Sequence, residues 1–158
     1  AVAIDRRTTG AYVGDQEIEL RAMSRVSEAF PEKSVNISTT SYNRQVLLTG
    51  QVPDEATRAR ATTVVKSVPE VKTVFNELAI AGVTSLTTQT SDSTITGNVK
   101  TRLLGNERVS ANNIKVVTET GVVYLMGLVT RSEASAATDI ARTTSGVTRV
   151  VTLFEYID

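Results

Sequence analysis

The chain has 158 residues, of which 41% are hydrophobic and 4% aromatic, and its 17 basic and 17 acidic side chains give a formal net charge of zero. This length suffices for one ordinary domain or two small ones, and the zero net charge excludes a global positive field that would attract nucleic acid. Cysteine and histidine are absent, which excludes thiol chemistry and the commonest general base and metal ligands. We therefore predict that the protein is not an enzyme, uses no cofactor or metal, and binds no nucleic acid.

Membrane-spanning and export signals are weak. No apolar run approaches the roughly 20 residues that a membrane span requires. The first nine residues include Arg6 and Arg7, but no apolar segment follows them, so a signal peptide is not expected. If the protein is exported, this sequence represents a mature or trimmed chain.

The first 80 residues predict one small module behind a tether. Residues 1–14 contain two glycines and are expected to be flexible. A helix is expected from Asp15, a suitable N-cap, to Pro31, which cannot continue it. Strands are expected at 35–41 and 45–52, a second helix at 54–67 and a third strand at 72–80. Asn43 lies in the turn of the hairpin, where it can adopt a positive φ.

A second set of elements follows residues 81–91, a Gly-, Ser- and Thr-rich stretch that we interpret as a linker. A helix is expected from Asp92 or Ser93 to about Leu104, with strands near 113–118 and 122–129. The capping-box pattern Thr130–Glu133 predicts the start of a second helix, which is expected to end at Ser145-Gly146. The last strand is expected at 147–156.

The two sets are copies of one another. Gly50 and Gly127 are separated by 77 positions, and so are Asp15 and Asp92, and Ile37 and Ile114. An internal repeat of this length predicts two tandem α-β-β-α-β modules, at 15–80 and 92–158. The fold class is then α+β, and each module is a three-stranded mixed sheet with two helices on one face.

The repeated motif Val-x-Leu-x-Gly-x-Val resembles the BON domain, a module of bacterial envelope proteins. It occurs as Val46-x-Leu48-x-Gly50-x-Val52 and again as Val123-x-Leu125-x-Gly127-x-Val129. In each copy a helix and a Val-x-x-Val strand follow. The segment from Asp5 to Gly10 is similar to the start of mature outer-membrane lipoproteins with two BON domains.

This resemblance implies a periplasmic protein tethered to the inner leaflet of the outer membrane through a lipidated cysteine, which is not present in this sequence. It also implies binding of an anionic phospholipid of the phosphatidylglycerol kind and a role in envelope integrity. The family is thought to contact lipid with the first helix of the second copy.

The residues of that helix suggest where a lipid would lie. The helix contains Lys100 and Arg102, and no carboxylate from Ser93 to Asn106. At 100° per residue, Ile95, Val99 and Leu103 form an inward stripe. The outward side then carries the predicted lipid-binding residues: Thr94, Gly97, Lys100, Thr101 and Leu104.

Two alternatives remain at this stage. Leu104 can pack under the linker or against the first copy, in which case Lys100 is ordinary surface. The whole chain can also be a protein-interaction or scaffold module of the envelope without direct lipid binding, using a sheet edge or the acidic first helix of copy one.

Overall fold

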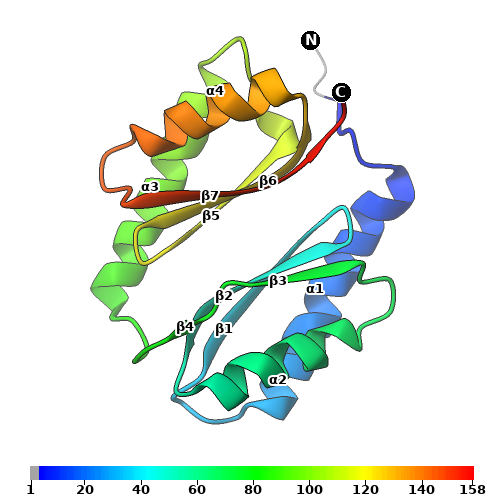
Figure 1. Cartoon of the computed structure of the whole chain (residues 1–158), viewed down its shortest axis with the longest axis vertical. Coiled ribbons are helices and arrows are strands. Elements are labelled where there is room, and N and C mark those ends of the chain that lie inside the picture. The colour runs from blue at the N-terminus through cyan, green and yellow to red at the C-terminus, as the bar shows by residue number, and fades with distance from the viewer. Residues whose placement is uncertain (1–3) are drawn as a thin grey trace. The chain divides into compact units, whose positions relative to one another are not determined.

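The computed structural model describes residues 4–158, which fold into two units (Figure 1). Module 1 comprises residues 7–84, and module 2 comprises residues 85–158 together with residues 4–6. Each unit has the element order α-β-β-α-β around a mixed sheet. The predicted α+β fold with two tandem modules is confirmed.

In module 1, helices α1 (Thr9–Ala29) and α2 (Glu55–Lys66) cover one face of the sheet (Figure 1). Strands β1 (Asn36–Tyr42) and β2 (Gln45–Val52) are antiparallel, whereas the short strands β3 (Thr73–Asn76) and β4 (Ala79–Ile80) both pair parallel with β2. The sequence predicted one continuous third strand. It is interrupted because the side-chain oxygen of Asn76 accepts a hydrogen bond from the Leu78 backbone N–H at 3.2 Å, a local turn that competes with the strand.

Module 2 repeats this layout with α3 (Leu86–Leu104), a 3₁₀ turn at Ala111–Asn113, β5 (Ile114–Glu119), β6 (Val122–Val129), α4 (Arg131–Arg142) and β7 (Arg149–Tyr156). The sheet order is β5-β6-β7. The predicted capping box is present, since Thr130 and Glu133 exchange hydrogen bonds with each other's backbone N–H. Helix α4 ends at Arg142, before the predicted Ser145, because the hydroxyls of Thr143 and Thr144 bond to its last carbonyls.

Each module has its own core between the helices and one face of the sheet. In module 1 it includes Val46, Leu48 and Val52 of β2, packed with residues of α1 and α2. In module 2 it includes Val123, Leu125 and Val129 of β6. The alternating residues of the BON-like motif are therefore the ones that face the helices, as expected for period-two patterning in a strand.

The glycine of each motif lies within the central strand, where the neighbouring strand comes very close. A Cβ added to Gly50 would lie 1.9 Å from the carbonyl oxygen of Asn36, and one added to Gly127 would lie 2.3 Å from that of Asn113. Gly50 also has a φ of +127°. These glycines thus serve close backbone packing inside the central strand.

Both first helices begin earlier than predicted. Thr8 caps α1 by accepting from the Ala11 N–H at 3.0 Å, and Ser85 caps α3 by accepting from the Thr88 N–H at 3.2 Å. Residues 9–14, predicted to belong to the tether, and 86–91, predicted to belong to the linker, are helical. Serine and threonine hydroxyls are good N-caps, so these segments need no carboxylate to start a helix.

The two aspartates predicted to be N-caps instead lie inside the helices and hold the hairpin turns. Asp15 accepts hydrogen bonds from the backbone N–H groups of Asn43 (2.7 Å) and Arg44 (2.8 Å). Asp92 accepts in the same way from Thr120 (2.7 Å) and Gly121 (2.9 Å). All four turn residues have φ between 50° and 78°, the geometry of a two-residue hairpin turn. The expectation of a positive φ at Asn43 is confirmed.

Candidate functional site

Helix α3 separates an inward apolar stripe from an outward polar face. Ile95, Val99 and Leu103 are buried in the module 2 core, as the sequence predicted. The five residues predicted to contact lipid are all exposed on the other side of this helix: Thr94, Gly97, Lys100, Thr101 and Leu104. The structure therefore brings them together on one surface of module 2.

Leu104 is a prominent apolar residue on this surface. It is 75% exposed, which argues against the alternative that it packs under the linker. Leu86 is 78% exposed and lies five helical turns before Leu104, so it points in the same direction. Sequence reasoning missed Leu86 because it assigned this residue to a linker; the signal was Ser85, which is a favourable N-cap.

Lys100 and Gly97 lie between the two leucines. Within residues 4–158, the Lys100 ammonium makes no hydrogen bond or ion pair. A Cβ at Gly97 would meet nothing within 4 Å, so the fold does not require glycine there. Because Gly97 has no side chain, the helix backbone is accessible there, and the Lys100 ammonium supplies one positive charge beside it.

The two threonines use their hydroxyls within the helix. Thr94 donates to the carbonyl of Thr90 at 3.1 Å, and Thr101 donates to the carbonyl of Gly97 at 2.9 Å. Their hydroxyl donors are thus already engaged within the helix. These two residues add uncharged surface to the outward face of α3.

Arg102 is positioned differently from what the sequence suggested. Its guanidinium donates to the carbonyl of Ile140 at 2.6 Å and to the hydroxyl of Thr144 at 2.8 Å, at the end of α4. A cation there is stabilised by the last carbonyls of the helix. Arg25 makes the equivalent contact in module 1, with the backbone carbonyl and hydroxyl of Ser67. Arg102 thus clamps the two helices of its module, and Lys100 is left as the charge of the outward face.

The outward face of α3 bears no exposed carboxylate. The only acidic residue of the helix is Asp92, which is 6% exposed and bonded to the hairpin turn. Beside Leu104 there is a hollow of about 200 Å³. It is lined by Lys100, Leu103, Leu104, Ala111, Asn112 and Ile114. An apolar floor next to a lysine suits a ligand with an apolar part and an anionic part.

Between residues 4 and 158 there is no group of three or more acidic side chains placed to hold a metal ion. None of the helices in this range is long and apolar enough to cross a membrane.

The duplicated fold and motif define a class of protein with two tandem BON modules. The BON-domain model matches residues 14–82 and residues 91–158. The chain therefore belongs to the BON-domain family and contains two copies of the domain.

Several named proteins are similar over most of this chain. It is 39% identical to the outer membrane lipoprotein DolP of Haemophilus influenzae, covering 99% of this chain and 82% of that protein. It is 32% identical to the 21 kDa hemolysin of Actinobacillus pleuropneumoniae, over 98% of this chain and 80% of that one. It is 29% identical to osmotically-inducible protein Y of Escherichia coli, over 89% of this chain and 72% of that protein.

Proposed function

We propose that this protein is a non-enzymatic periplasmic phospholipid-binding protein that associates with the outer membrane and supports envelope integrity. Anionic lipid is contacted by the outward face of α3, through Thr94, Gly97, Lys100, Thr101 and Leu104, with Leu86 at the far end of the same face. A lipidated cysteine ahead of this sequence would provide the tether.

The observation that carries the proposal is the combination of apolar and cationic groups on a face without exposed carboxylates. Leu86 and Leu104 lie about 27 Å apart along the helix, at 1.5 Å per residue, with Lys100 between them. A helix with this composition can lie in the headgroup region of a bilayer, with its leucines in the acyl boundary and its ammonium at the phosphates.

The relatives support the location. The protein from H. influenzae that is 39% identical is named an outer membrane lipoprotein. Similarity over nearly the whole of this chain makes the same compartment the best proposal here. The missing histidine and cysteine support a non-enzymatic role.

The proposal is tested by binding of the full chain to vesicles of phosphatidylglycerol and of phosphatidylcholine. Binding is expected only to the anionic vesicles. Replacing Lys100 with Gln is expected to weaken it about fivefold, since one lysine near an anionic surface contributes about 1 kcal/mol. Leu104→Glu is expected to weaken it more than tenfold, because burial of a leucine contributes about 2 kcal/mol and the carboxylate adds repulsion.

Leu20→Glu provides the matched control, because Leu20 is an exposed leucine of α1 in module 1. It is expected to leave vesicle binding unchanged. Equal binding to both kinds of vesicle, or undiminished binding by Leu104→Glu, would contradict the proposal. A protein-interaction role without direct lipid binding would then be the better explanation.

A further inference from the structure

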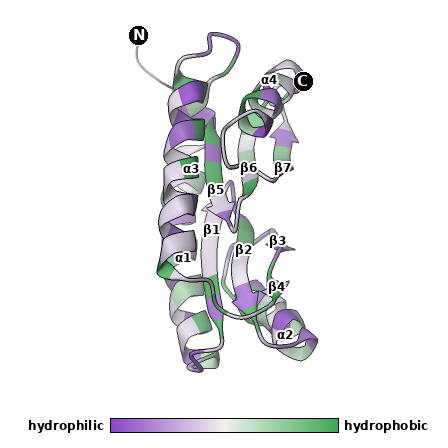
Figure 2. Ribbon diagram, turned by 90° about the vertical axis from the view of Figure 1, so that its left-hand side faces the viewer, coloured by the Kyte–Doolittle hydropathy of each residue, from purple (hydrophilic) through white to green (hydrophobic). Residues whose placement is uncertain are grey.

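The last strand of module 2, β7, lies at an edge of its sheet. The strand order is β5-β6-β7, and the eight residues of β7 pair in parallel with β6. Helix α4 packs against this strand (Figure 2). An edge strand presents a row of backbone N–H and C=O groups with which a further extended segment can pair. The edge is therefore a place where the sheet can be extended.

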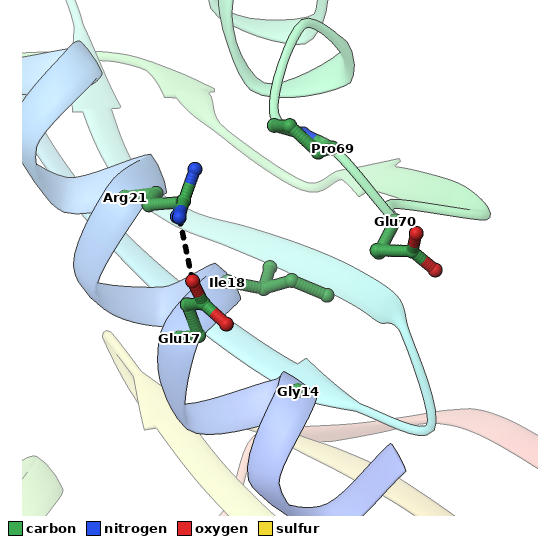
Figure 3. A pocket seen from close by; sticks show the side chains of 6 residues that line it. All are labelled: Gly14, Glu17, Ile18, Arg21, Pro69 and Glu70. Carbon is green, nitrogen blue, oxygen red and sulfur yellow. Dashed lines mark hydrogen bonds and ion pairs between the residues drawn. The ribbon is translucent and has the colours of Figure 1, made fainter. Parts of the chain in front are cut away.

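Module 1 fills the groove between its second helix and its last strands with side chains. The Arg58 guanidinium of α2 donates to the backbone carbonyls of Asn76 at 3.2 Å and Leu78 at 3.1 Å. The Asn76 amide in turn donates to the hydroxyl of Thr62 at 2.7 Å. One arginine thus both fills this groove and supplies the donors for two strand carbonyls. A hollow of about 100 Å³ in module 1 lies elsewhere, between α1 and the loop after α2 (Figure 3).

The duplicated fold identifies the counterparts of these residues in module 2. The N-caps of the two second helices, Asp54 and Thr130, are 76 positions apart. The last strands begin at Thr73 and Arg149, which are separated by the same 76 positions. The counterparts of Arg58, Thr62 and Asn76 are therefore Ala134, Thr138 and Thr152.

The same groove is open in module 2. With alanine in place of the arginine, a hollow of about 340 Å³ lies between α4 and β7, and Ala134, Thr138 and Thr152 all line it. In the described part of the chain, no side chain donates a hydrogen bond to the carbonyls of Thr152 and Phe154, the counterparts of the two that Arg58 binds. Strand β7 is also continuous, whereas the last strand of module 1 is interrupted. Module 2 thus lacks both the filling and the donors that module 1 takes from its own helix.

An extended peptide segment would supply both missing parts. Its backbone N–H groups would donate to the β7 carbonyls, and one of its side chains would enter the hollow. The charges around the hollow are already paired, Asp139 with Arg142 at 3.0 Å and Arg131 with Asp158 at 3.5 Å. Ala134 gives the hollow an apolar wall. An uncharged aliphatic side chain therefore suits the hollow better than a charged one.

We propose that the β7 edge and the hollow beside α4 form a binding site for an extended segment of another protein. The segment adds a strand to the module 2 sheet and places an uncharged aliphatic side chain in the hollow. This site lies on α4 and β7, whereas the proposed lipid face lies on α3. The two proposals therefore do not depend on one another.

The test uses a synthetic peptide of alternating valine and threonine, with lysines at both ends for solubility. It is titrated into the isotope-labelled full chain and followed by NMR, and shifts are expected in β7 and in α4 around Ala134 and Thr138. Two control peptides carry N-methyl groups, one on the valine nitrogens and the other on the threonine nitrogens. Because alternate N–H groups of a strand face the same edge, one control peptide is expected to lose binding and the other to retain it.

The variant Ala134→Arg/Thr152→Asn gives module 2 the side chains with which module 1 fills its groove. It is expected to remain folded, because module 1 folds with these residues, and to weaken peptide binding by about tenfold or more. Ser132→Arg is the matched control, because it adds the same charge at an exposed position of α4 that does not line the hollow. Ser132→Arg and Leu104→Ser should both leave peptide binding unchanged.

Other results would overturn the proposal. An absence of shifts at millimolar peptide, retained binding by both N-methylated peptides, or undiminished binding by the double variant would show that β7 does not accept a strand. Shifts confined to the outward face of α3 would assign the peptide to that face instead. Concentration-dependent self-association that disappears in the double variant would assign the edge to a second copy of the chain.

Discussion

The guanidinium of Arg6 forms two parallel hydrogen bonds with the carboxylate of Glu133, at 2.7 and 3.1 Å, across 127 residues of sequence. The same arginine donates to the carbonyl of Leu128 at 2.9 Å, and its backbone N–H donates to the side chain of Asn113. Glu133 also belongs to the capping box of α4. The segment before α1 thus completes the start of the last helix of module 2.

This contact predicts that Arg6 stabilises module 2. Arg6→Ala should lower the free energy of unfolding of this module by about 1.5–3 kcal/mol, the usual contribution of charge-assisted hydrogen bonds. Urea unfolding followed by NMR signals of α4 measures the effect. The control is Arg21→Ala, which removes an exposed pair with Glu17 and should change stability by less than about 0.5 kcal/mol. Equal effects of the two variants would contradict this prediction.

The same contact predicts a pH dependence. Hydrogen bonding from Arg6 lowers the pKa of Glu133 from 4.5 to about 2. Because this pKa is lower in the folded state, the stabilisation is complete above about pH 4.5 and is lost as the pH falls through about 2. Its size is on the order of 3 kcal/mol, at 1.36 kcal/mol per pKa unit. The Glu133 side chain is 13% exposed, so solvent screening is limited.

Glu133→Gln should therefore be less stable than the natural chain at pH 7 and similar to it near pH 2. Urea unfolding of the variant and of the natural chain, at a series of pH values between 2 and 7, measures the two stability differences. If the variant loses stability between pH 4.5 and 2 as steeply as the natural chain, other carboxylates cause the pH dependence.

The buried aspartates predict a second kind of stability effect. Asp92→Ala leaves the part-buried backbone N–H groups of Thr120 and Gly121 without their acceptor. The expected loss is about 1 kcal/mol, near the lower end of the cost of an unsatisfied donor. Asp15→Ala should cost more. Asp15 also accepts from the Ser41 hydroxyl at 2.8 Å and pairs with Arg7 at 3.0 Å. Thermal unfolding of both variants checks the order, and a larger loss for Asp92→Ala would contradict it.

These aspartates also show where sequence reasoning reached its limit. The inward stripe of Ile95, Val99 and Leu103 follows from helical periodicity, which is local, and the structure places all three in the core. The acceptor role of Asp92 depends on a turn 28 residues away in sequence. Nothing near Asp92 distinguishes an N-cap from a carboxylate that binds a distant turn.

The exposed residues of the candidate lipid face could also be predicted from helical periodicity. Outward positions such as Leu104 follow from the same periodicity once the inward stripe is known. Arg102 was not predictable in this way, because its partners at the end of α4 lie 38 and 42 residues later. Leu86 was missed because helix α3 begins with threonines and serine, which have low helix propensity. Its exposed first turn is started by the Ser85 side-chain cap rather than by an apolar pattern.

The glycines give the sharpest contrast, because the same substitution should have opposite effects at two positions. Gly127→Ala forces a Cβ to within 2.3 Å of the Asn113 carbonyl oxygen, so the strands must separate. We expect a loss of at least about 3 kcal/mol or failure of module 2 to fold. Gly97→Ala meets nothing within 4 Å in an exposed helix interior, and should stabilise α3 by up to about 1 kcal/mol.

The Gly97→Ala variant also probes how lipid approaches the helix. If an acyl chain or headgroup lies directly on the backbone at this position, vesicle binding should fall although the protein becomes more stable. If lipid contacts only the projecting side chains of Lys100 and Leu104, vesicle binding should be unchanged. Thermal unfolding and vesicle binding of the one variant separate these two arrangements, and destabilisation by Gly97→Ala would contradict the open helix surface described for this site.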